Sequence, residues 1–274
     1  MANWLITGAA SGLGLALAKA ALAHGDTVCG TVRKQEAVAA FEALAPGRAF
    51  AVVLDLSELS AIGAAAEQAI AALGQVDILV NNAGYGLIGA IEEAGIAEAK
   101  AQFDVNVFAP IALIQAVLPA MRARGEGRII NVTSVSGLAS WAGTGVYCAS
   151  KYALEAIGQT LRQEVGPLGI KVTNIEPGGM RTDYAGGSMK IAVRKIEDYE
   201  PTAGQSLAIL QGHAGQEAGD PDKVADAIIA VANLAEPPMH LLLGEDALHY
   251  AMRQQDAFGA DMQAWMPLTL STGF

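Results

Sequence analysis

Short apolar runs alternate with helical stretches along most of this chain, and that alternation limits the folds it can adopt. The runs are rich in Val, Ile and Leu on both faces, which is typical of strands buried on both sides of a parallel sheet. Seven strands are predicted, at NWLIT, TVCGTV, AFAVVLDL, VDILVNNAG, GRIINVTS, IKVTNIEPG and MHLLLG. With helices between them, they predict an α/β fold, a doubly wound parallel sheet with helices on both faces.

The predicted helices follow the strands in turn. The first starts in the glycine-rich turn GAASGLG and ends at Gly25, and the next two cover QEAVAAFEAL and ELSAIGAAAEQAIAALG. Apolar residues at helical spacing predict further helices near Ala97–Ala123, around Tyr147, near Pro221–Leu234 and around Ala247–Trp265.

No repeat, composition break or Pro/Ser-rich linker divides the 274 residues, so we expect a single domain over residues 1–274. A chain that is 52% hydrophobic and 16% charged, with 31 glycines, suits a compact enzyme and does not suit disorder. The pattern weakens from about 180 to 220, where we expect a partly helical substrate flap; a long surface connection is the alternative. Residues from about 245 to 274 are expected to form a C-terminal helical extension.

Acidic residues outnumber basic ones, giving a formal net charge of −11. This charge argues against a nucleic-acid or membrane partner, because both need clustered Lys and Arg. Neither Cys29 nor Cys148 belongs to a CxxC pattern, so a reducing cytoplasm is the expected location. We find no run of about 18 uncharged apolar residues that would predict a membrane span. The four histidines lack ligand spacing, so no metal site is predicted.

Tyr147 and Lys151 are four residues apart on a predicted helix and therefore share one of its faces. A free tyrosine has a pKa of about 10 and is a poor acid–base catalyst at neutral pH. An ammonium group beside it favours the phenolate and lowers that pKa. The pair therefore predicts a proton shuttle for hydride transfer to or from a carbonyl. An exposed Tyr/Lys pair on a helix surface is the alternative that spacing alone leaves open.

The turn Thr7-Gly8-Ala9-Ala10-Ser11-Gly12-Leu13-Gly14 ends the first predicted strand and opens a helix. Glycines let the backbone approach a diphosphate, and a helix N-terminus offers free N–H groups to it. In this context the pattern TGxxxGxG predicts a dinucleotide site on a Rossmann fold, although an ordinary turn has the same letters.

Five features follow one another in a fixed order: TGxxxGxG, Asp55 after the third strand, the segment Asn81-Asn82-Ala83-Gly84, Ser134, and the Tyr147/Lys151 pair. In this order, and over nearly the whole chain, the sequence resembles the single-domain short-chain dehydrogenase/reductases. The segment NNAGYGLIGAIEE and the long C-terminal extension resemble most the steroid- and retinol-dehydrogenase-like members.

The resemblance implies four catalytic residues. Tyr147 is the general acid or base, Lys151 lowers its pKa and binds the nicotinamide ribose, and Ser134 orients the substrate oxygen. Asn106, in FDVNVF, resembles the helix asparagine whose carbonyl holds a water in the proton relay; a polar residue that kinks the helix is the alternative. All four residues are present, which favours an enzyme over a non-catalytic dinucleotide-binding sensor.

The resemblance also implies the cofactor contacts. Asp55 would contact the adenine, residues 81–84 the adenosine side, and the segment 177–182 the carboxamide and diphosphate. The implied cofactor-binding residues are Thr7, Gly8, Ser11, Gly12, Leu13, Gly14, Arg33, Lys34, Asp55, Leu56, Asn82, Ala83, Gly84, Tyr147, Lys151, Pro177, Gly178 and Thr182.

The end of the second strand indicates which dinucleotide is preferred. An acidic residue there holds the ribose 2′-OH of NAD, but this chain has Val32, followed by Arg33 and Lys34. Two cations suit the 2′-phosphate, so NADP(H) is favoured over NAD(H). An NAD-dependent alcohol dehydrogenase of the same family is the alternative.

A mostly apolar substrate pocket is expected from Ser134, Trp141, Met180 and Tyr184, with simple loop packing as the alternative. Such a pocket favours a small apolar ketone or aldehyde, or a secondary alcohol. The resemblance further implies a homodimer or homotetramer in which the Tyr147 helix and the helix near Asn106 pair with their copies.

Overall fold

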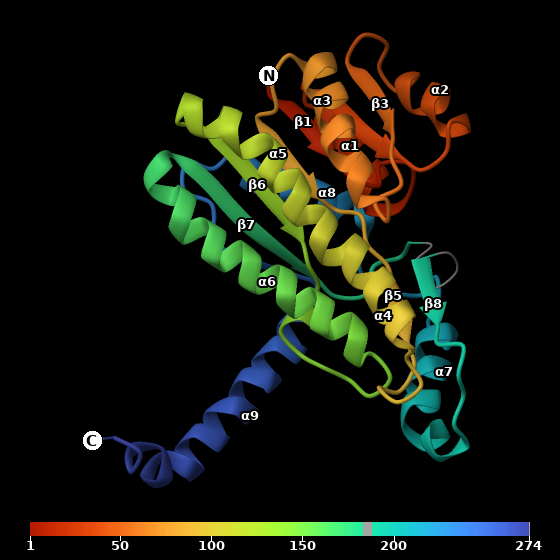
Figure 1. Ribbon diagram of the computed structural model, residues 1–274, viewed down its shortest axis with the longest axis vertical. Helices are drawn as coiled ribbons and strands as arrows, with labels where there is room; N and C mark the ends of the chain where they lie inside the picture. The colour runs from red at the N-terminus through yellow and green to blue at the C-terminus, as the bar shows by residue number, and fades with distance from the viewer. Residues whose placement is uncertain (183–187, 274) are drawn as a thin grey trace.

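Seven parallel strands form the centre of the molecule, in the order β3-β2-β1-β4-β6-β7-β9 (Figure 1). The computed structural model describes residues 1–182 and 188–273. The strands are β1 (Asn3–Ile6), β2 (Thr27–Val32), β3 (Ala49–Val53), β4 (Ile78–Asn81), β6 (Gly127–Val132), β7 (Ile170–Pro177) and β9 (His240–Leu243). The predicted fold class is confirmed. Strand order reverses between β1 and β4, and sheets of this kind bind ligands beyond the carboxyl ends of the strands at that point.

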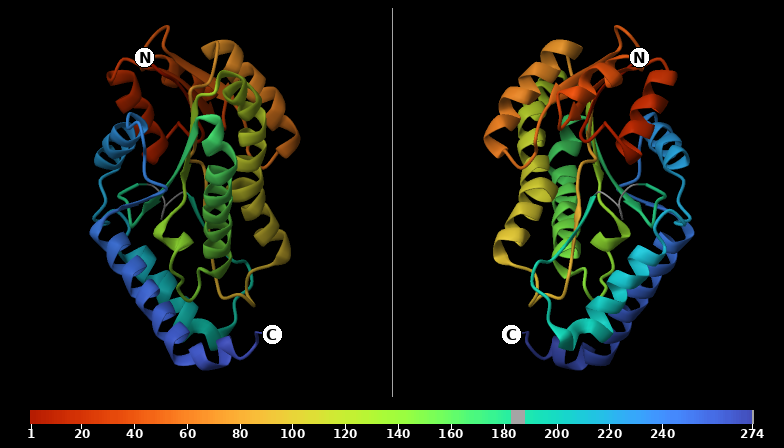
Figure 2. Two further views of the ribbon diagram at one scale, coloured as in Figure 1. Left: turned by 90° about the vertical axis from the view of Figure 1, so that its left-hand side faces the viewer. Right: turned by 90° about the vertical axis from the view of Figure 1, so that its right-hand side faces the viewer.

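Helices cover both faces of the sheet (Figure 2). One face packs against α3, α5 and α6, and the other against α1 and α8, with Phe41 of α2. The helices are α1 (Gly12–Ala23), α2 (Glu36–Glu42), α3 (Ile62–Leu73), α4 (Ile96–Phe103), α5 (Ala109–Arg124), α6 (Gly145–Val165), α7 (Gln205–Gly212), α8 (Pro221–Ala232) and α9 (Glu245–Leu270).

Strand β1 shows why the apolar runs are continuous. Leu5 belongs to the core beneath α3, α5 and α6, whereas its neighbours Trp4 and Ile6 belong to the core beneath α1 and α8. Successive side chains of a strand point to opposite faces, and here both faces are buried. A strand that is buried on both faces therefore has apolar residues at successive positions, and does not alternate between apolar and polar ones.

The long helix predicted near Ala97–Ala123 is helical from Ile96 to Arg124, but it contains a π-helical turn at Asp104–Phe108 between α4 and α5. By length and composition this stretch could cross a membrane. In this fold Leu113, Val117 and Met121 of α5 lie in the core of the sheet, so packing accounts for its apolar composition.

The segment at about 180–220, expected to be a partly helical flap, also contains a short strand that the sequence did not predict. Strand β8 (Met189–Ile191) pairs with β5 (Gly86–Ile88) in a separate two-stranded sheet. A 3₁₀ turn, a π-helical turn and α7 follow β8. The two ends of the segment meet where Met180 forms a bridge with Gly219.

The C-terminal helix α9 begins two residues before its predicted start at Ala247 and runs five residues beyond Trp265. Figure 1 shows it leaving the sheet, with the C-terminus at its far end. Of the residues described in this helix, Ala247 alone is buried.

Candidate active site

The glycine-rich turn after β1 leaves room for a diphosphate. Gly8 and Gly12 have φ values of 66° and 52°, a conformation that favours glycine. A Cβ on Gly14 would lie 2.3 Å from the carbonyl oxygen of Gly8. The N-cap of α1, Ser11, is exposed and its side chain does not cap the helix, so the first N–H groups of α1 are available to an anion. The turn therefore fits a dinucleotide diphosphate.

Thr7 joins the glycine turn to the segment after β4. Its hydroxyl oxygen accepts hydrogen bonds from the backbone N–H groups of Asn82, at 2.9 Å, and Ala83, at 3.0 Å. The side-chain amide of Asn82 donates to the carbonyl of Thr7 at 2.8 Å. A Cβ on Gly84 would lie 3.1 Å from Oδ1 of Asn106. Residues 82–84 thus pass closely between the glycine turn and the π-helical turn that contains Asn106. The side chain of Leu13 lies in the core.

Arg33 and Lys34 are exposed directly after β2, and Val32 before them is buried. Asp55 follows the neighbouring strand β3, and its carboxylate accepts hydrogen bonds from the backbone N–H and the hydroxyl of Ser57 at 2.9 and 2.8 Å. These two bonds lower the pKa of Asp55. Asp55 thus caps the turn after its strand. Its contact with the adenine remains a prediction, as does a cofactor contact of the buried Leu56.

Tyr147 and Lys151 lie on one face of α6, with the ammonium 5.9 Å from the centre of the tyrosine ring. The Lys151 ammonium donates to the carbonyl of Val132, at the end of β6, at 2.9 Å. Burial lowers the pKa of Lys151 to about 8, and the Glu155 carboxylate opposes that shift. Tyr147 and Ser134 are both partly exposed. The hydroxyl of Ser134 accepts from the backbone N–H of Ser136 at 3.0 Å.

Asn106 lies in the π-helical turn and is buried. Its side-chain oxygen accepts from the N–H of Tyr85 at 3.1 Å, and its amide donates to the Tyr85 carbonyl at 2.9 Å and to the Ser150 hydroxyl at 3.0 Å. The Asn106 side chain therefore connects Tyr85, just before β5, to Ser150 of α6. Ser150 directly precedes Lys151 in the sequence. π-Helical turns shift the backbone bonding pattern and occur often at functional sites.

The segment after β7 returns to the glycine turn. A Cβ on Gly12 would contact the Thr182 side chain at 3.7 Å. A Cβ on Gly178 would lie 2.2 Å from the Asp246 carboxylate, which accepts from the N–H of Gly179 at 2.7 Å. Pro177 is buried at the end of β7. Four separate segments, after β1, β4, β6 and β7, therefore meet at one edge of the sheet.

The predicted substrate residues are less closely grouped. The Trp141 ring packs edge to face against Tyr250 of α9, with ring centres 5.1 Å apart. Met180 is partly buried against the core beneath α1 and α8. Tyr184 lies outside the described residues.

The structure also reveals a polar row that the sequence did not predict; its three asparagines are buried and its histidine is exposed. Asn81, Asn131, Asn174 and His240 are register partners across β4, β6, β7 and β9. The Asn81 amide donates to Asn131 at 2.9 Å, and the Asn131 amide donates to Asn174 at 3.0 Å. The Asn174 amide then donates to the carboxylate of Glu155, on α6, at 2.6 Å. No spacing motif marks these residues, because strand register brings them together.

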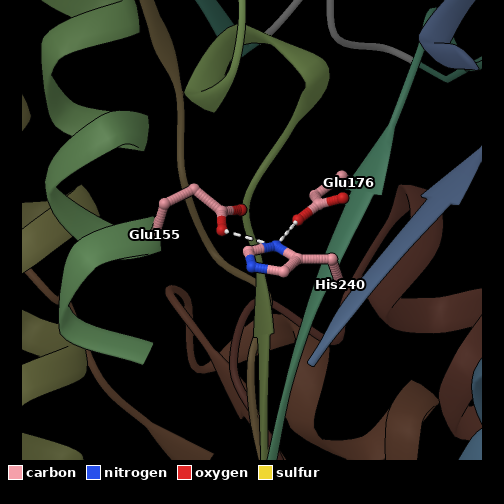
Figure 3. Close-up of side chains that lie close together, drawn as sticks. All are labelled: Glu155, Glu176 and His240. Atoms are coloured by element: carbon pink, nitrogen blue, oxygen red, sulfur yellow. Dashed lines mark hydrogen bonds and ion pairs between the residues drawn. The ribbon is translucent and has the colours of Figure 1, made fainter. Parts of the chain in front are cut away.

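Glu155, Glu176 and His240 form a cluster at the end of this row (Figure 3). Nδ1 of His240 lies 2.5 Å from Glu176 and 3.4 Å from Glu155. Both carboxyls are buried, and Glu155 Oε1 and Glu176 Oε2 have no hydrogen-bond partner among the described residues. Burial, together with repulsion from Glu155, raises the pKa of Glu176 to about 7.

These three groups offer ligand atoms within 4.8 Å of one another, as a metal site would. However, the Nδ1 atom of His240 and the Oε1 atom of Glu176 are only 2.5 Å apart. Two ligand atoms that each lie about 2.0–2.1 Å from one metal ion are normally further from each other than this. A shared proton fits that separation better than a metal ion does.

Comparison with known proteins gives consistent matches. A model of the short chain dehydrogenase family matches residues 2–190. Oxidoreductase BOA17 of Botryotinia fuckeliana is 36% identical over 98% of both chains. The 3-ketodihydrosphingosine reductase of Bacteroides thetaiotaomicron is 34% identical over 88% of this chain and 87% of its own. The NADPH-dependent 3-dehydrocapnine reductase of Ornithobacterium rhinotracheale is 36% identical over 66% of each.

Solved structures agree with these matches. A short-chain dehydrogenase from Streptomyces avermitilis has a TM-score of 0.93 at 38% identity, and the match covers 100% of both chains. A short-chain dehydrogenase/reductase from Burkholderia phymatum in complex with NAD has a TM-score of 0.82 at 25% identity, over 95% of each chain. A metagenomic short-chain oxidoreductase in complex with NADP has a TM-score of 0.69 at 29% identity, over 88% of this chain and 96% of its own.

Proposed function

The chain belongs to the short-chain dehydrogenase/reductase family, and on that basis we propose that it is an NADP(H)-dependent oxidoreductase. Its substrate is an apolar ketone or aldehyde, or the corresponding secondary alcohol. A bound nicotinamide would supply or accept the hydride. The chain's own residues bind the dinucleotide, orient the substrate oxygen and move one proton.

The observation that carries this proposal is the position of Lys151 beside Tyr147. Both lie at the edge of the sheet where the glycine-rich turn follows β1. A buried ammonium near the phenol favours its ionised form and so brings its proton transfer closer to neutral pH. Ser134 precedes the turn that packs on α6. We assign its hydroxyl the role of orienting the substrate oxygen by a hydrogen bond. Asn106 holds the adjacent turn of α6 through Ser150.

Replacing Tyr147 with Phe tests the proton transfer. We expect kcat to fall about 10²-fold or more, while NADPH affinity stays nearly unchanged, because only the hydroxyl is lost. Oxidation of NADPH by a panel of apolar ketones and aldehydes, followed by nicotinamide absorbance, measures kcat, and fluorescence titration measures binding. Turnover near the wild-type rate would show that Tyr147 is not the acid.

The preference for NADP(H) is supported by Arg33 and Lys34, which are exposed beyond β2 where an NAD-preferring site has a carboxylate. The name of the Ornithobacterium relative specifies NADPH. Similar structures hold NAD in one case and NADP in another, so membership of the family alone does not decide the preference.

Arg33→Asp should reverse this preference. The carboxylate would repel the 2′-phosphate and accept a hydrogen bond from a free 2′-OH. The ratio of kcat/KM for NADPH to that for NADH should therefore fall at least tenfold, a change of about 1.4 kcal/mol. The control is Arg194→Asp, at an exposed position in the flap, which should leave the ratio unchanged. Arg48 would be a poor choice because its side chain donates to two backbone carbonyls and supports the fold. A wild-type enzyme that prefers NADH would contradict the assignment.

The proposed substrate class depends on the residues expected to line the pocket. Trp141 and Met180 are apolar, and Tyr250 of α9 extends the apolar side through its contact with Trp141. Two relatives are named as reductases of a 3-keto and a 3-dehydro compound, which favours carbonyl reduction here.

A further inference from the structure

Asp246, in the first turn of α9, joins the C-terminal part of the chain to the segment after β7. Its carboxylate accepts a hydrogen bond from the backbone N–H of Gly179 at 2.7 Å. The preceding N–H, that of Gly178, donates to the carbonyl of Leu243, the last residue of β9, at 3.0 Å. The pairing of β7 with β9 therefore continues past the ends of both strands, and Asp246 supplies the acceptor for the next N–H.

Gly178 leaves the space that the Asp246 carboxylate occupies. A Cβ on Gly178 would lie 2.2 and 2.3 Å from the two carboxylate oxygens, so any other residue there would displace them. Glycine also loses more conformational freedom on ordering than any other residue. The pair Gly178-Gly179 therefore gains little order from its own sequence, and depends on contacts such as that of Asp246 to keep one conformation.

The same segment meets the glycine-rich turn at its other end. Between the two ends, the carbonyl of Gly179 accepts from the N–H of Gly219 at 2.9 Å, and Met180 forms a bridge with Gly219. At the far end, a Cβ on Gly12 would contact the side chain of Thr182 at 3.7 Å. Gly219 thus holds the carbonyl side of Gly179, whereas Asp246 holds its N–H side.

The carboxylate of Asp246 is itself fixed, because the start of α9 is anchored beside it. Ala247 is buried, and Tyr250 lies one turn after Asp246 on the same face of the helix. The Tyr250 ring packs edge to face on Trp141, in the loop before α6, with ring centres 5.1 Å apart. Asp246 therefore presents its acceptor to Gly179 from a helix that is already held in place.

We propose that Asp246 is a positioning residue for the dinucleotide: by holding Gly179, it keeps the segment 177–182 in the conformation that binds the cofactor. This inference rests on the proposed function, in which that segment binds the carboxamide and the diphosphate. Asp246 acts through the backbone of the segment. When only a fraction of the molecules has the binding conformation, the apparent Kd rises by the inverse of that fraction. Loss of the acceptor should therefore weaken cofactor binding.

Asp246→Ala tests this role through cofactor affinity. The Kd for NADPH, measured by fluorescence titration, should rise about tenfold, as it would if about one molecule in ten kept the binding conformation. Asp246→Leu also lacks an acceptor and should behave in the same way. Asp246→Asn keeps an acceptor oxygen, although a neutral and weaker one, and should restore the Kd to within about threefold of the wild-type value. Glu245→Ala, at the exposed neighbouring carboxylate, is the matched control and should leave the Kd unchanged.

Hydrogen exchange provides a readout that needs neither cofactor nor substrate. In the cofactor-free protein, the amide of Gly179 should exchange faster in Asp246→Ala than in the wild type or in Asp246→Asn, because its acceptor has been removed. The amides of β1 should exchange at the same rate in all three proteins. Far-UV circular dichroism verifies that each variant is folded.

The proposal would be overturned if Asp246→Ala bound NADPH as tightly as the wild type does, or if Asp246→Asn bound it as weakly as Asp246→Ala. Unchanged exchange at Gly179 in Asp246→Ala would also overturn it, as would an equal loss of affinity in Glu245→Ala. A wild type that binds neither NADPH nor NADH would contradict the proposed function, and this inference with it. The affinity of the wild type therefore separates the two failures.

Discussion

At the scale of single residues, Gly14 has the least space of the glycines in the turn after β1. A Cβ there would lie 2.3 Å from the Gly8 carbonyl oxygen and 2.6 Å from the Asn82 side-chain amide. The first neighbour is backbone and cannot rotate away, so the turn itself would have to move. The tight turn that admits a diphosphate therefore depends on one missing methyl group.

Gly14→Ala should consequently weaken both folding and cofactor binding. Overpacking of this kind costs about 1–3 kcal/mol, and a displaced turn should raise the Kd for NADPH. Gly63→Ala is the matched control, since Gly63 lies in α3 and a Cβ added to it would have no described neighbour within 4 Å. That change should stabilise the protein by about 0.5–1 kcal/mol. Urea unfolding measures the free energy of unfolding, and fluorescence titration measures the Kd for NADPH. Equal changes in both quantities for Gly14→Ala and Gly63→Ala would contradict the role given to Gly14.

At the scale of elements, α6 carries a row of functional groups along one face. Tyr147, Lys151 and Glu155 are spaced by four residues, and Glu155 is held by the Asn174 amide and faces His240. Glu155 is the charge that opposes the burial shift in the pKa of Lys151. The edge of the sheet thereby influences the end of α6 that carries Lys151 and Tyr147.

Glu155→Gln should lower the pKa of Lys151 below about 8, because the neighbouring negative charge is lost while the acceptor for Asn174 is kept. The ammonium that supports Tyr147 would then be lost at lower pH. The alkaline limb of the kcat/KM–pH profile should move to lower pH, whereas Glu164→Gln, at an exposed position of α6, should leave it in place. A variant that is active with an unshifted profile would show that Glu155 does not act on Lys151.

The elements differ in how well the sequence predicts them. All seven strands of the main sheet can be predicted, because each is an apolar run that ends in turn residues. Strands β5 and β8 cannot, since each has only three residues and pairs with a segment about 100 positions away. The Tyr147/Lys151 pair can be found from helix spacing, whereas the row from Asn81 to His240 cannot. It depends on strand register, which local sequence does not encode.

At the scale of the whole molecule, the buried carboxyl of Glu176 makes stability depend on pH. Its pKa is raised from 4.5 to about 7, so between these values the folded protein binds a proton that the unfolded chain has released. Stability therefore falls as pH rises from about 4.5 to 7, because the folded state must give up that proton.

Glu176→Gln should remove this dependence, since the amide stays neutral throughout. The free energy of unfolding in urea, compared at pH about 5 and about 8, should fall in the wild type and change less in the variant. Glu164→Gln should follow the wild type. A wild type whose stability rises over this range, relative to that of Glu176→Gln, would contradict the raised pKa.

The position of β9 in the chain also determines when the sheet can be finished during synthesis. Both Glu155 and Glu176 have been synthesised once β7 is complete, but His240 follows Glu176 by 64 residues. Until then the outer edge of β7 has no neighbouring strand, and the two carboxyls have no imidazole beside them. A growing chain therefore cannot complete this half of the sheet until β9 has emerged from the ribosome.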